Sequence, residues 1–188
     1  MLEYKILKNQ NFLYEDYHIS PIQKKEIEQI RIWRNEQMDV LRQTDIISFY
    51  SQIQYFEKTV WPEYNKLDPD KILVSLYKDN KFIGYGGLVY IDWSKLNAEV
   101  SFLIAPDRMS NFNIYANDFH NFLFLIKKLA KEDLGLISLS SETYSFRDKH
   151  IRILEKLNFK LKKTNKKTIQ KNNNTFDSLF HECLLNEG

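Results

Sequence analysis

Three side chains in this sequence, Glu99, Tyr144 and His150, are candidates for moving a proton during a reaction. A carboxylate can accept a proton from an attacking group, and a tyrosine or a histidine can return one to a leaving group. Each also has an ordinary structural alternative: a solvated strand glutamate, a tyrosine packed under a helix and a structural helix histidine. The residue types therefore indicate general acid–base chemistry and leave those alternatives open.

A second set of side chains follows the first predicted helix and could bind an anionic group: Arg34, Asn35, Arg42 and Gln43. Guanidinium groups suit a phosphate or a carboxylate because they offer two donors side by side. The alternative is that these are helix-end charges, with a buried arginine holding the next loop. Tyr85 could stack on a base or a sugar ring, in a chain whose residues are 14% aromatic.

The glycines and the cysteine exclude several common kinds of site. The five glycines form neither GxGxxG nor GxxxxGKS/T, which excludes the Rossmann fingerprint and the P-loop. The single cysteine, Cys183, excludes a disulfide framework and a cysteine-based zinc site, and we expect it in the core. His18, His120 and His181 show no metal-ligand spacing, so no metal is expected.

The composition predicts one globular domain over residues 1–188. Hydrophobic residues make up 43% of the chain and charged residues 28%, with a net charge of +2, which points to neither nucleic acid nor a membrane as a partner. The N-terminus lacks an apolar segment of signal-peptide length, and no run approaches the ~20 apolar residues of a membrane span. We therefore expect a cytoplasmic protein.

The elements that must position these side chains begin with a strand over residues 12–19, which Pro21 follows. Helical spacing of apolar residues predicts a helix over residues 25–37. A second helix should begin after Ser48, as its N-cap, and stop at Pro62. Its buried stripe would consist of Phe49, Ile53, Phe56 and Val60.

Three strands are predicted next, over residues 72–77, 82–91 and 98–104, and the short turns between them favour antiparallel pairing. The glycines between Gly84 and Gly87 indicate a bulge where a helix packs on the sheet, with access for an acceptor molecule as the alternative.

A polar loop over residues 107–113 leads to the most strongly periodic helix, with a buried stripe of Tyr115, Phe119, Phe122, Ile126 and Leu129. The short strand that follows, over residues 136–141, should pair in parallel with the strand before the helix.

Ser145 and Asp148 resemble a capping box for a helix that ends at Leu157. Two last strands are predicted over residues 159–163 and 176–185, joined by a polar and basic segment that we expect to be an exposed hairpin tip or loop. The order of elements predicts an α/β (α+β) fold with one mixed, mostly antiparallel sheet.

Four segments, in this order, resemble the GNAT superfamily of acyl-CoA N-acyltransferases. They are IEQIRIWRNEQMDVLRQ (27–43), KFIGYGGLVYID (81–92), AEVSFLIAP (98–106) and SETYSFRDKHIRILEKLNF (141–159). The first is similar to the WRN helix of the branch that contains the ribosomal-protein N-terminal acetyltransferases. The first two also resemble a subgroup associated with bacterial surface-polysaccharide and amino-sugar pathways.

The resemblance implies about seven strands and four helices, with a central splay between the strands at 98–104 and 136–141. It also implies acetyl-CoA as cosubstrate, with its pantetheine arm along the open strand edge formed by Ser101, Phe102, Leu103 and Ile104.

The resemblance places the pyrophosphate of acetyl-CoA at the N-terminus of the next helix. The residues that would hold the cofactor there are Arg108, Asn111, Asn113 and Ile114, with Arg147 on the following helix. The family's two glycines are missing from this loop. We therefore expect Asn111 and Asn113 to take the left-handed backbone angles that glycine would adopt.

The resemblance also implies catalytic roles. Glu99 would act as the base on the acceptor side, through a water, with a pKa raised by partial burial. Tyr144 would protonate the leaving thiolate, and His150 would act near the thioester or touch the cofactor. The tyrosine that many members use as general acid is replaced here by Leu154.

The sequence thus predicts an N-acetyltransferase that moves an acetyl group from acetyl-CoA to a primary amine, of a small amino-sugar or nucleotide-sugar metabolite. The alternatives are a protein or peptide N-terminus as acceptor, and a non-catalytic binding module with a degenerate CoA loop. The acceptor would contact Arg34, Asn35, Arg42, Gln43 and Tyr85, and the protein would be a monomer or a homodimer.

Overall fold

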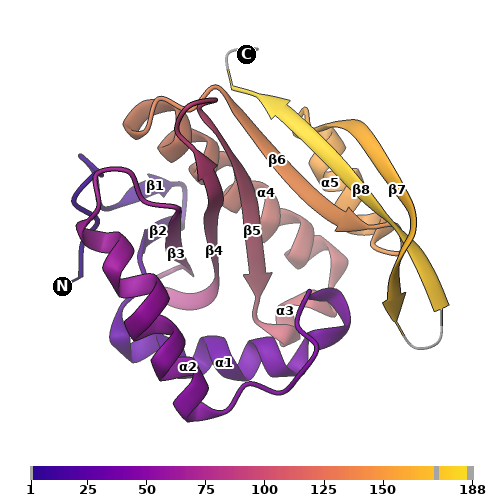
Figure 1. The fold of residues 1–188 in the computed structure, drawn as a ribbon, viewed down its shortest axis with the longest axis horizontal. Helices are drawn as coiled ribbons and strands as arrows, with labels where there is room; N and C mark the ends of the chain where they lie inside the picture. The colour runs from indigo at the N-terminus through magenta and orange to yellow at the C-terminus, as the bar shows by residue number, and fades with distance from the viewer. Residues whose placement is uncertain (1, 172–173, 186–188) are drawn as a thin grey trace.

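One sheet of eight strands forms the centre of the computed structural model, which describes residues 2–171 and 174–185 (Figure 1). The spatial order is β1-β2-β3-β4-β5-β6-β8-β7. Among the pairings of these described residues, that of β5 with β6 alone is parallel. The strands are β1 Phe12–Tyr14, β2 Tyr17–Pro21, β3 Lys71–Lys78, β4 Lys81–Asp92, β5 Asn97–Ile104, β6 Ser138–Tyr144, β7 Lys160–Lys171 and β8 Asn174–Leu184. The predicted mixed, mostly antiparallel α+β sheet is confirmed.

The additional strand arises at the N-terminus, where one strand was predicted over residues 12–19. The segment is instead a tight hairpin of β1 and β2, in which Tyr14 lies opposite Tyr17. Glu15 has φ 53°, a left-handed angle that turns the chain within two residues. Because the turn contains neither glycine nor proline, no local pattern predicts it.

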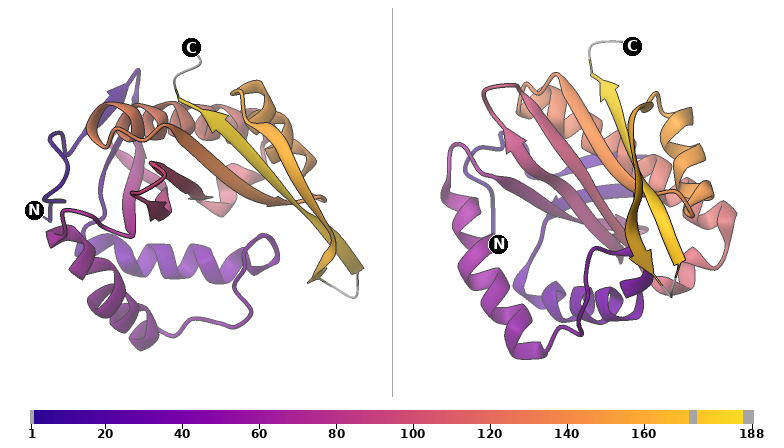
Figure 2. Two further views of the ribbon diagram at one scale, coloured as in Figure 1. Left: turned by 45° about the horizontal axis from the view of Figure 1, so that its top comes forward. Right: turned by 45° about the vertical axis from the view of Figure 1, so that its right-hand side comes forward.

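The helices lie on both faces of the sheet, with α1 and α2 on one side and α4 and α5 on the other (Figure 2). Their bounds are α1 Ile27–Glu36, α2 Phe49–Tyr55, α3 Pro106–Met109, α4 Phe112–Lys128 and α5 Asp148–Lys156. The short α3 occupies part of the predicted polar loop, because Pro106 suits the first turn of a helix. No helix in the described part of the chain is long and apolar enough to cross a bilayer.

The second helix differs from its prediction at both ends. Ser48 does cap it, by accepting a hydrogen bond from the amide of Ser51. Phe49 is 57% exposed, however, while Gln52 is buried. Pro62 does not stop the helical path, which continues through Phe56–Val60 and Trp61–Asn65, because a proline in a first turn needs no amide partner.

The meander β3-β4-β5 forms as predicted, and one of its glycines, Gly86, lies against a helix. A Cβ at Gly86 would lie 2.1 Å from the carbonyl oxygen of Ser101 and 2.7 Å from the ring of Phe122 on α4. The irregularity in pairing lies just before the glycines, opposite Leu76 and Tyr77. Close approach of α4 is therefore what Gly86 provides, and it fixes the distance between α4 and the strand that borders the site.

The predicted central splay is present. The strands β5 and β6 pair only over Asn97–Glu99 and Ser138–Ser140. Beyond these residues β6 diverges from β5, while it pairs with β8 along its whole length (Figure 1). The strand β6 is also longer than predicted, since it reaches Tyr144. Residues 142 and 144 therefore lie on the strand and not past its end.

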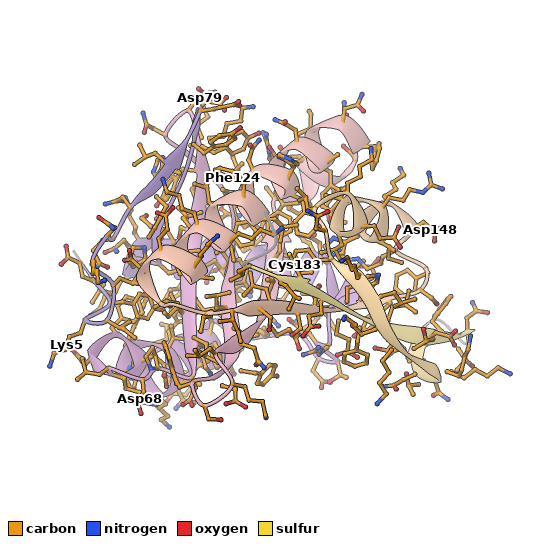
Figure 3. The ribbon with its side chains drawn as sticks, turned by 90° about the horizontal axis from the view of Figure 1, so that it is seen from above. Lys5, Asp68, Asp79, Phe124, Asp148 and Cys183 are labelled. Carbon is orange, nitrogen blue, oxygen red and sulfur yellow. The ribbon has the colours of Figure 1, made fainter. Side chains whose placement is uncertain are left out.

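The C-terminal elements correct two further predictions. Ser145 does not cap α5: its amide and hydroxyl oxygen bond to the backbone of Asp177, which extends the β6–β8 pairing by one residue. The segment predicted as a hairpin tip or loop is largely strand, because Asp177 also accepts bonds from the amide of Lys167 and the Nζ of Lys166. Residues 172–173 of that tip lie outside the described residues. Cys183 is buried in the interior, as expected (Figure 3).

Candidate functional site

A cleft of about 580 Å³ opens where β5 and β6 separate, and both faces of the sheet contribute to it. Alternation along the strands directs Glu99, Glu142 and Tyr144 to the face that carries α1, and Phe102 and Thr143 to the face that carries α4. We call these the α1 side and the α4 side. The α1 side includes Arg34, Arg42, Tyr55, Lys71, Tyr90, Glu99, Glu142 and Tyr144; the α4 side includes Phe102, Phe119, Thr143, Arg147 and His150.

A charged cluster of Arg42, Glu99 and Glu142 bridges the splay on the α1 side. The Nη2 of Arg42 donates to Glu99 Oε1 at 2.8 Å and also to Glu142. The second oxygen of Glu142 accepts from the hydroxyl of Ser178 on β8. One guanidinium thus holds the two strands' carboxylates together, in a site where Arg42 remains 48% exposed.

The pKa of Glu99 is raised in this cluster. Burial is the main cause, Arg42 opposes it, and the charge of Glu142 adds to it. A carboxylate with a raised pKa is a stronger base when it is deprotonated. The structure therefore gives Glu99 the environment that the sequence predicted for a base.

The other predicted acceptor-side residues mainly hold the loop after α1. Arg34 donates to the hydroxyl of Tyr85 at 2.8 Å and to Gln43 Oε1 at 3.1 Å. Asn35 bonds to both backbone groups of Ile47. Of this set, only Arg34 and Arg42 line the cleft. Tyr85 is 6% exposed, so its ring lies within the core.

The α4 side has one cation, Arg147, and is otherwise lined by neutral, tightly packed side chains. His150 stacks on Phe119, with ring centroids 4.2 Å apart, and Phe119 stacks in turn on Phe102 of β5. The Nδ1 of His150 lies 2.5 Å from the hydroxyl of Tyr115 on α4. Arg147 donates to that same hydroxyl at 3.4 Å.

The N-terminus of α4 is closed by the chain's own side chains. Asn111 Oδ1 accepts from the amides of Asn113 and Ile114. Its φ is −99°, and Asn113 lies within α4, so the prediction of left-handed angles at both asparagines is wrong. The physical reason is that an asparagine side chain can cap the helix itself from an extended backbone.

Arg108, predicted to contact the pyrophosphate, forms a two-bond ion pair with the fully buried Asp118, at 2.7 and 2.9 Å. The hydroxyl of Tyr17 donates to the same carboxylate at 2.7 Å. The guanidinium of Arg108 therefore joins α3 to α4 and compensates a buried charge.

Sequence reasoning missed three tyrosines at or beside the cleft. Tyr115 was counted only as a core position of its helix, and its hydroxyl partner lies 35 residues away on α5. Tyr55 and Tyr90 are 45% and 69% exposed and line the α1 side. Alternation along β4 does not predict which face Tyr90 occupies, because the register of β4 shifts between Val89 and Asp92.

Residues 19–180 match the family model described as an acetyltransferase (GNAT) domain. The fold resembles spermidine N-acetyltransferase from Vibrio cholerae in complex with CoA and spermine, with TM-score 0.77, 14% identity and coverage of 90% of this chain and 96% of that chain. A dodecameric structure of the Vibrio cholerae enzyme matches with TM-score 0.75, 14% identity and coverage of 90% and 94%. None of the curated sequences compared with this chain matches it. At these identities the structural likeness shows the fold alone.

Proposed function

The chain belongs to the GNAT family of acetyltransferases, as its four sequence segments predicted, and we propose that it transfers the acetyl group of acetyl-CoA to the primary amine of a small amino sugar carried on a nucleotide. Acetyl transfer from acetyl-CoA is the chemistry of the family. The narrower likeness, to the ribosomal-protein branch and its polysaccharide-pathway subgroup, belongs to the proposal, as does the choice of acceptor.

The observation that carries the acceptor proposal is the combination of exposed tyrosines and cations on the α1 side. Tyr55 interacts electrostatically with Arg34, and Tyr90 interacts electrostatically with Arg42. The Nζ of Lys71 lies 5.9 Å from the centre of the Tyr55 ring. Aromatic rings pack on sugar and base faces, and cations pair with diphosphate oxygens. This lining suits a nucleotide-linked sugar.

The charges of the cleft favour that acceptor over a polyamine, which is the substrate class named for the Vibrio cholerae enzymes. Apart from Arg147, which lies on the α4 side, the charged lining residues in the described chain are the cations Arg34, Arg42 and Lys71 and the carboxylates Asp70, Glu99 and Glu142. These charges balance, so the acceptor side offers a polycation no excess of negative charge to bind it. A peptide N-terminus remains the second candidate, because its single amine does not need such an excess.

On the α1 side we assign proton removal to Glu99. A primary amine must lose a proton to become a nucleophile, and Glu99 can take it directly or through a water. Arg42 holds Glu99 and Glu142 at the splay, so the carboxylate is positioned before the acceptor arrives. Burial raises the pKa of Tyr144, which keeps its hydroxyl protonated and able to supply a proton to the leaving sulfur.

The residues of the splay fit the pantetheine part of acetyl-CoA. The edge of β5 from Ser101 to Ile104 has no strand partner on the β6 side. Its backbone groups are therefore available to the amides of pantetheine. Thr143 lines the cleft, and its Oγ1 has no hydrogen-bond partner among the described residues. When bound, acetyl-CoA supplies a thioester carbonyl that an amine can attack. Phe102 and Arg147, which line the cleft, would complete this contact surface, whereas the side chain of Leu103 is buried in the core.

The pyrophosphate end fits less directly. The amides of Asn113 and Ile114 would have to exchange Asn111 Oδ1 for phosphate oxygens. Arg108 would act through its ion pair with Asp118, by fixing the start of α4.

An acceptor panel tests the proposal, with thiol release from acetyl-CoA as the readout. The acceptors are a uridine-diphosphate-linked amino sugar, the free amino sugar, spermidine and a tripeptide with a free N-terminus. We expect kcat/KM for the nucleotide-linked sugar to exceed that for the free sugar at least tenfold. A higher kcat/KM for spermidine or for the peptide would overturn the acceptor assignment.

Tyr55→Ala serves as the variant and Tyr50→Ala, an exposed tyrosine of α2 outside the cleft lining, as its matched control. Only the first should reduce the preference for the nucleotide-linked sugar. Thermal stabilisation by acetyl-CoA without thiol release from any acceptor would favour the non-catalytic binding module instead.

A further inference from the structure

Three polar side chains on the α4 side form a short chain of contacts that the acid–base assignments above do not use. Tyr115, on α4, lies between Arg147 Nη2 at 3.4 Å and His150 Nδ1 at 2.5 Å. Tyr115 and His150 are 7% and 6% exposed. Stacking against Phe119, with an interplanar angle of 17°, fixes the plane of the imidazole.

The direction of the bond between Tyr115 and His150 follows from the donors available. Arginine has only N–H donors, so Arg147 must use the tyrosine oxygen as an acceptor. The tyrosine proton then has one acceptor among its contacts within the described chain, His150 Nδ1. Burial raises the pKa of Tyr115, which keeps that proton in place. The bond therefore runs from the Tyr115 hydroxyl to a bare Nδ1.

The charge state of His150 follows from its surroundings. Burial is the largest cause that lowers its pKa well below the usual value, followed by the charge of Arg147 and by His181 on β8. The titratable and charged groups that face it in the described structure are Arg147, Tyr115 and His181, and none of them is a carboxylate. At neutral pH the ring is therefore neutral and carries one proton.

We propose that Tyr115 is a positioning residue that fixes His150 as the Nε2–H tautomer, which gives the cleft a permanent neutral N–H donor. A neutral imidazole with a bare Nδ1 must carry its proton on Nε2. His150 lines the cleft. In the described residues, neither of its ring nitrogens is both buried and without a hydrogen-bond partner. The Nε2–H group is the part of the ring left to face a ligand.

This role differs from the acid–base role that the sequence suggested for His150. A neutral ring releases its remaining proton with great difficulty, so it stabilises a developing negative charge by donating a hydrogen bond. The group that gains such a charge during acetyl transfer is the thioester, as its carbonyl is attacked and its sulfur leaves. This use of the donor rests on the proposed function, whereas the tautomer is a property of the chain alone.

The tautomer can be measured without any substrate. We would record nitrogen-15 chemical shifts of the imidazoles between pH 5.5 and 8.5 and assign His150 with the His150→Asn variant. We expect a bare Nδ1, a protonated Nε2 and no titration in that range. A protonated Nδ1, or a charge change in that range, would overturn the proposal. In Tyr115→Phe we expect the two tautomers to mix, and an unchanged spectrum would contradict the positioning role.

Activity then tests the use of the donor. Tyr115→Phe should lower kcat about tenfold and leave KM for acetyl-CoA nearly unchanged. Its matched control is Tyr64→Phe, a buried tyrosine whose hydroxyl donates to the carbonyl of Ile22. His150→Gln, which retains an N–H donor, should keep at least ten times the kcat of His150→Leu. Equal loss in the two variants would refute hydrogen-bond donation by His150, and the tautomer result would still stand separately.

Discussion

The two sides of the cleft meet at one gap between strands, yet they contain opposite kinds of chemistry. On the α1 side, Arg42 bridges Glu99 and Glu142 in a cluster that solvent can reach. On the α4 side, Tyr115 and His150 form a buried, neutral pair with little exposure.

The difference suggests a division of roles. Charges near solvent can gain and lose protons during each turnover, whereas a buried neutral group changes its protonation only at a large energetic cost. We therefore assign proton movement to the α1 side, and orientation and binding to the α4 side. Variants on the α1 side should change kcat together with its pH dependence. Variants on the α4 side should leave that pH dependence unchanged and act through hydrogen-bond donation, stability or acetyl-CoA affinity.

The largest expected effect is on the α1 side. Glu99→Gln keeps the shape of the side chain but cannot accept a proton, so kcat should fall about 10²- to 10⁴-fold. Steady-state thiol release measures this loss. Glu28→Gln, which removes a carboxylate paired with Arg31 on α1, is the control and should have little effect. If Glu99→Gln retains activity within a factor of two, proton removal does not depend on Glu99.

A large effect on stability is expected on the α4 side. Arg108→Met leaves the fully buried Asp118 without its cation, which should lower the free energy of unfolding by about 3 kcal/mol. Urea unfolding measures this change. The control Lys66→Met removes an exposed cation from Glu63 and Asp70 and should cost far less. Similar losses in the two variants would show that the Arg108 pair has no structural importance.

A smaller effect is expected at the N-terminus of α4. Asn111→Gly removes the side chain that occupies the amides of Asn113 and Ile114, at a stability cost of a few tenths of a kcal/mol. Acetyl-CoA should then bind about three- to tenfold more tightly in calorimetry. Ser48→Gly removes the cap of α2 and is the matched control. Weaker binding in Asn111→Gly would mean that Asn111 itself contacts the ligand.

The smallest effect is a shift in pH dependence. The active form of a base is deprotonated, so the acid limb of the kcat profile follows the pKa of Glu99. Arg42 lowers that pKa and Glu142 raises it. Arg42→Ala should move the limb to higher pH, and Glu142→Gln should move it to lower pH. If the two variants shift the limb in the same direction, or do not shift it, the acid limb does not report the pKa of Glu99.

Periodic segments were predictable from sequence because their pattern reports burial directly. The α4 stripe from Tyr115 to Leu129 is buried, and the meander β3-β4-β5 pairs as expected. Alternation along β5 likewise predicts which face Glu99 occupies, whereas its position beside the splay is implied by the resemblance to the family.

The predictions that failed depend on partners distant in sequence. Ser145 looks like a helix cap until Asp177, 32 residues later, is seen to pair with it. Arg108 looks available for phosphate until Asp118 is known to be buried opposite it. Asn111 does lie at the start of α4, but the prediction of a left-handed backbone there is wrong, because its own side chain satisfies the helix amides. Local sequence pattern thus predicts the helices and strands, whereas the roles of the site residues depend on hydrogen bonds between elements that are distant in sequence.

Initial rates over a matrix of acetyl-CoA and nucleotide-linked amino-sugar concentrations test the division of the cleft most directly. If the acceptor occupies the α1 side while acetyl-CoA occupies the splay and the α4 side, both must be bound before transfer. Double-reciprocal plots should then intersect. Parallel lines would indicate an acetylated enzyme and contradict direct transfer between the two sides.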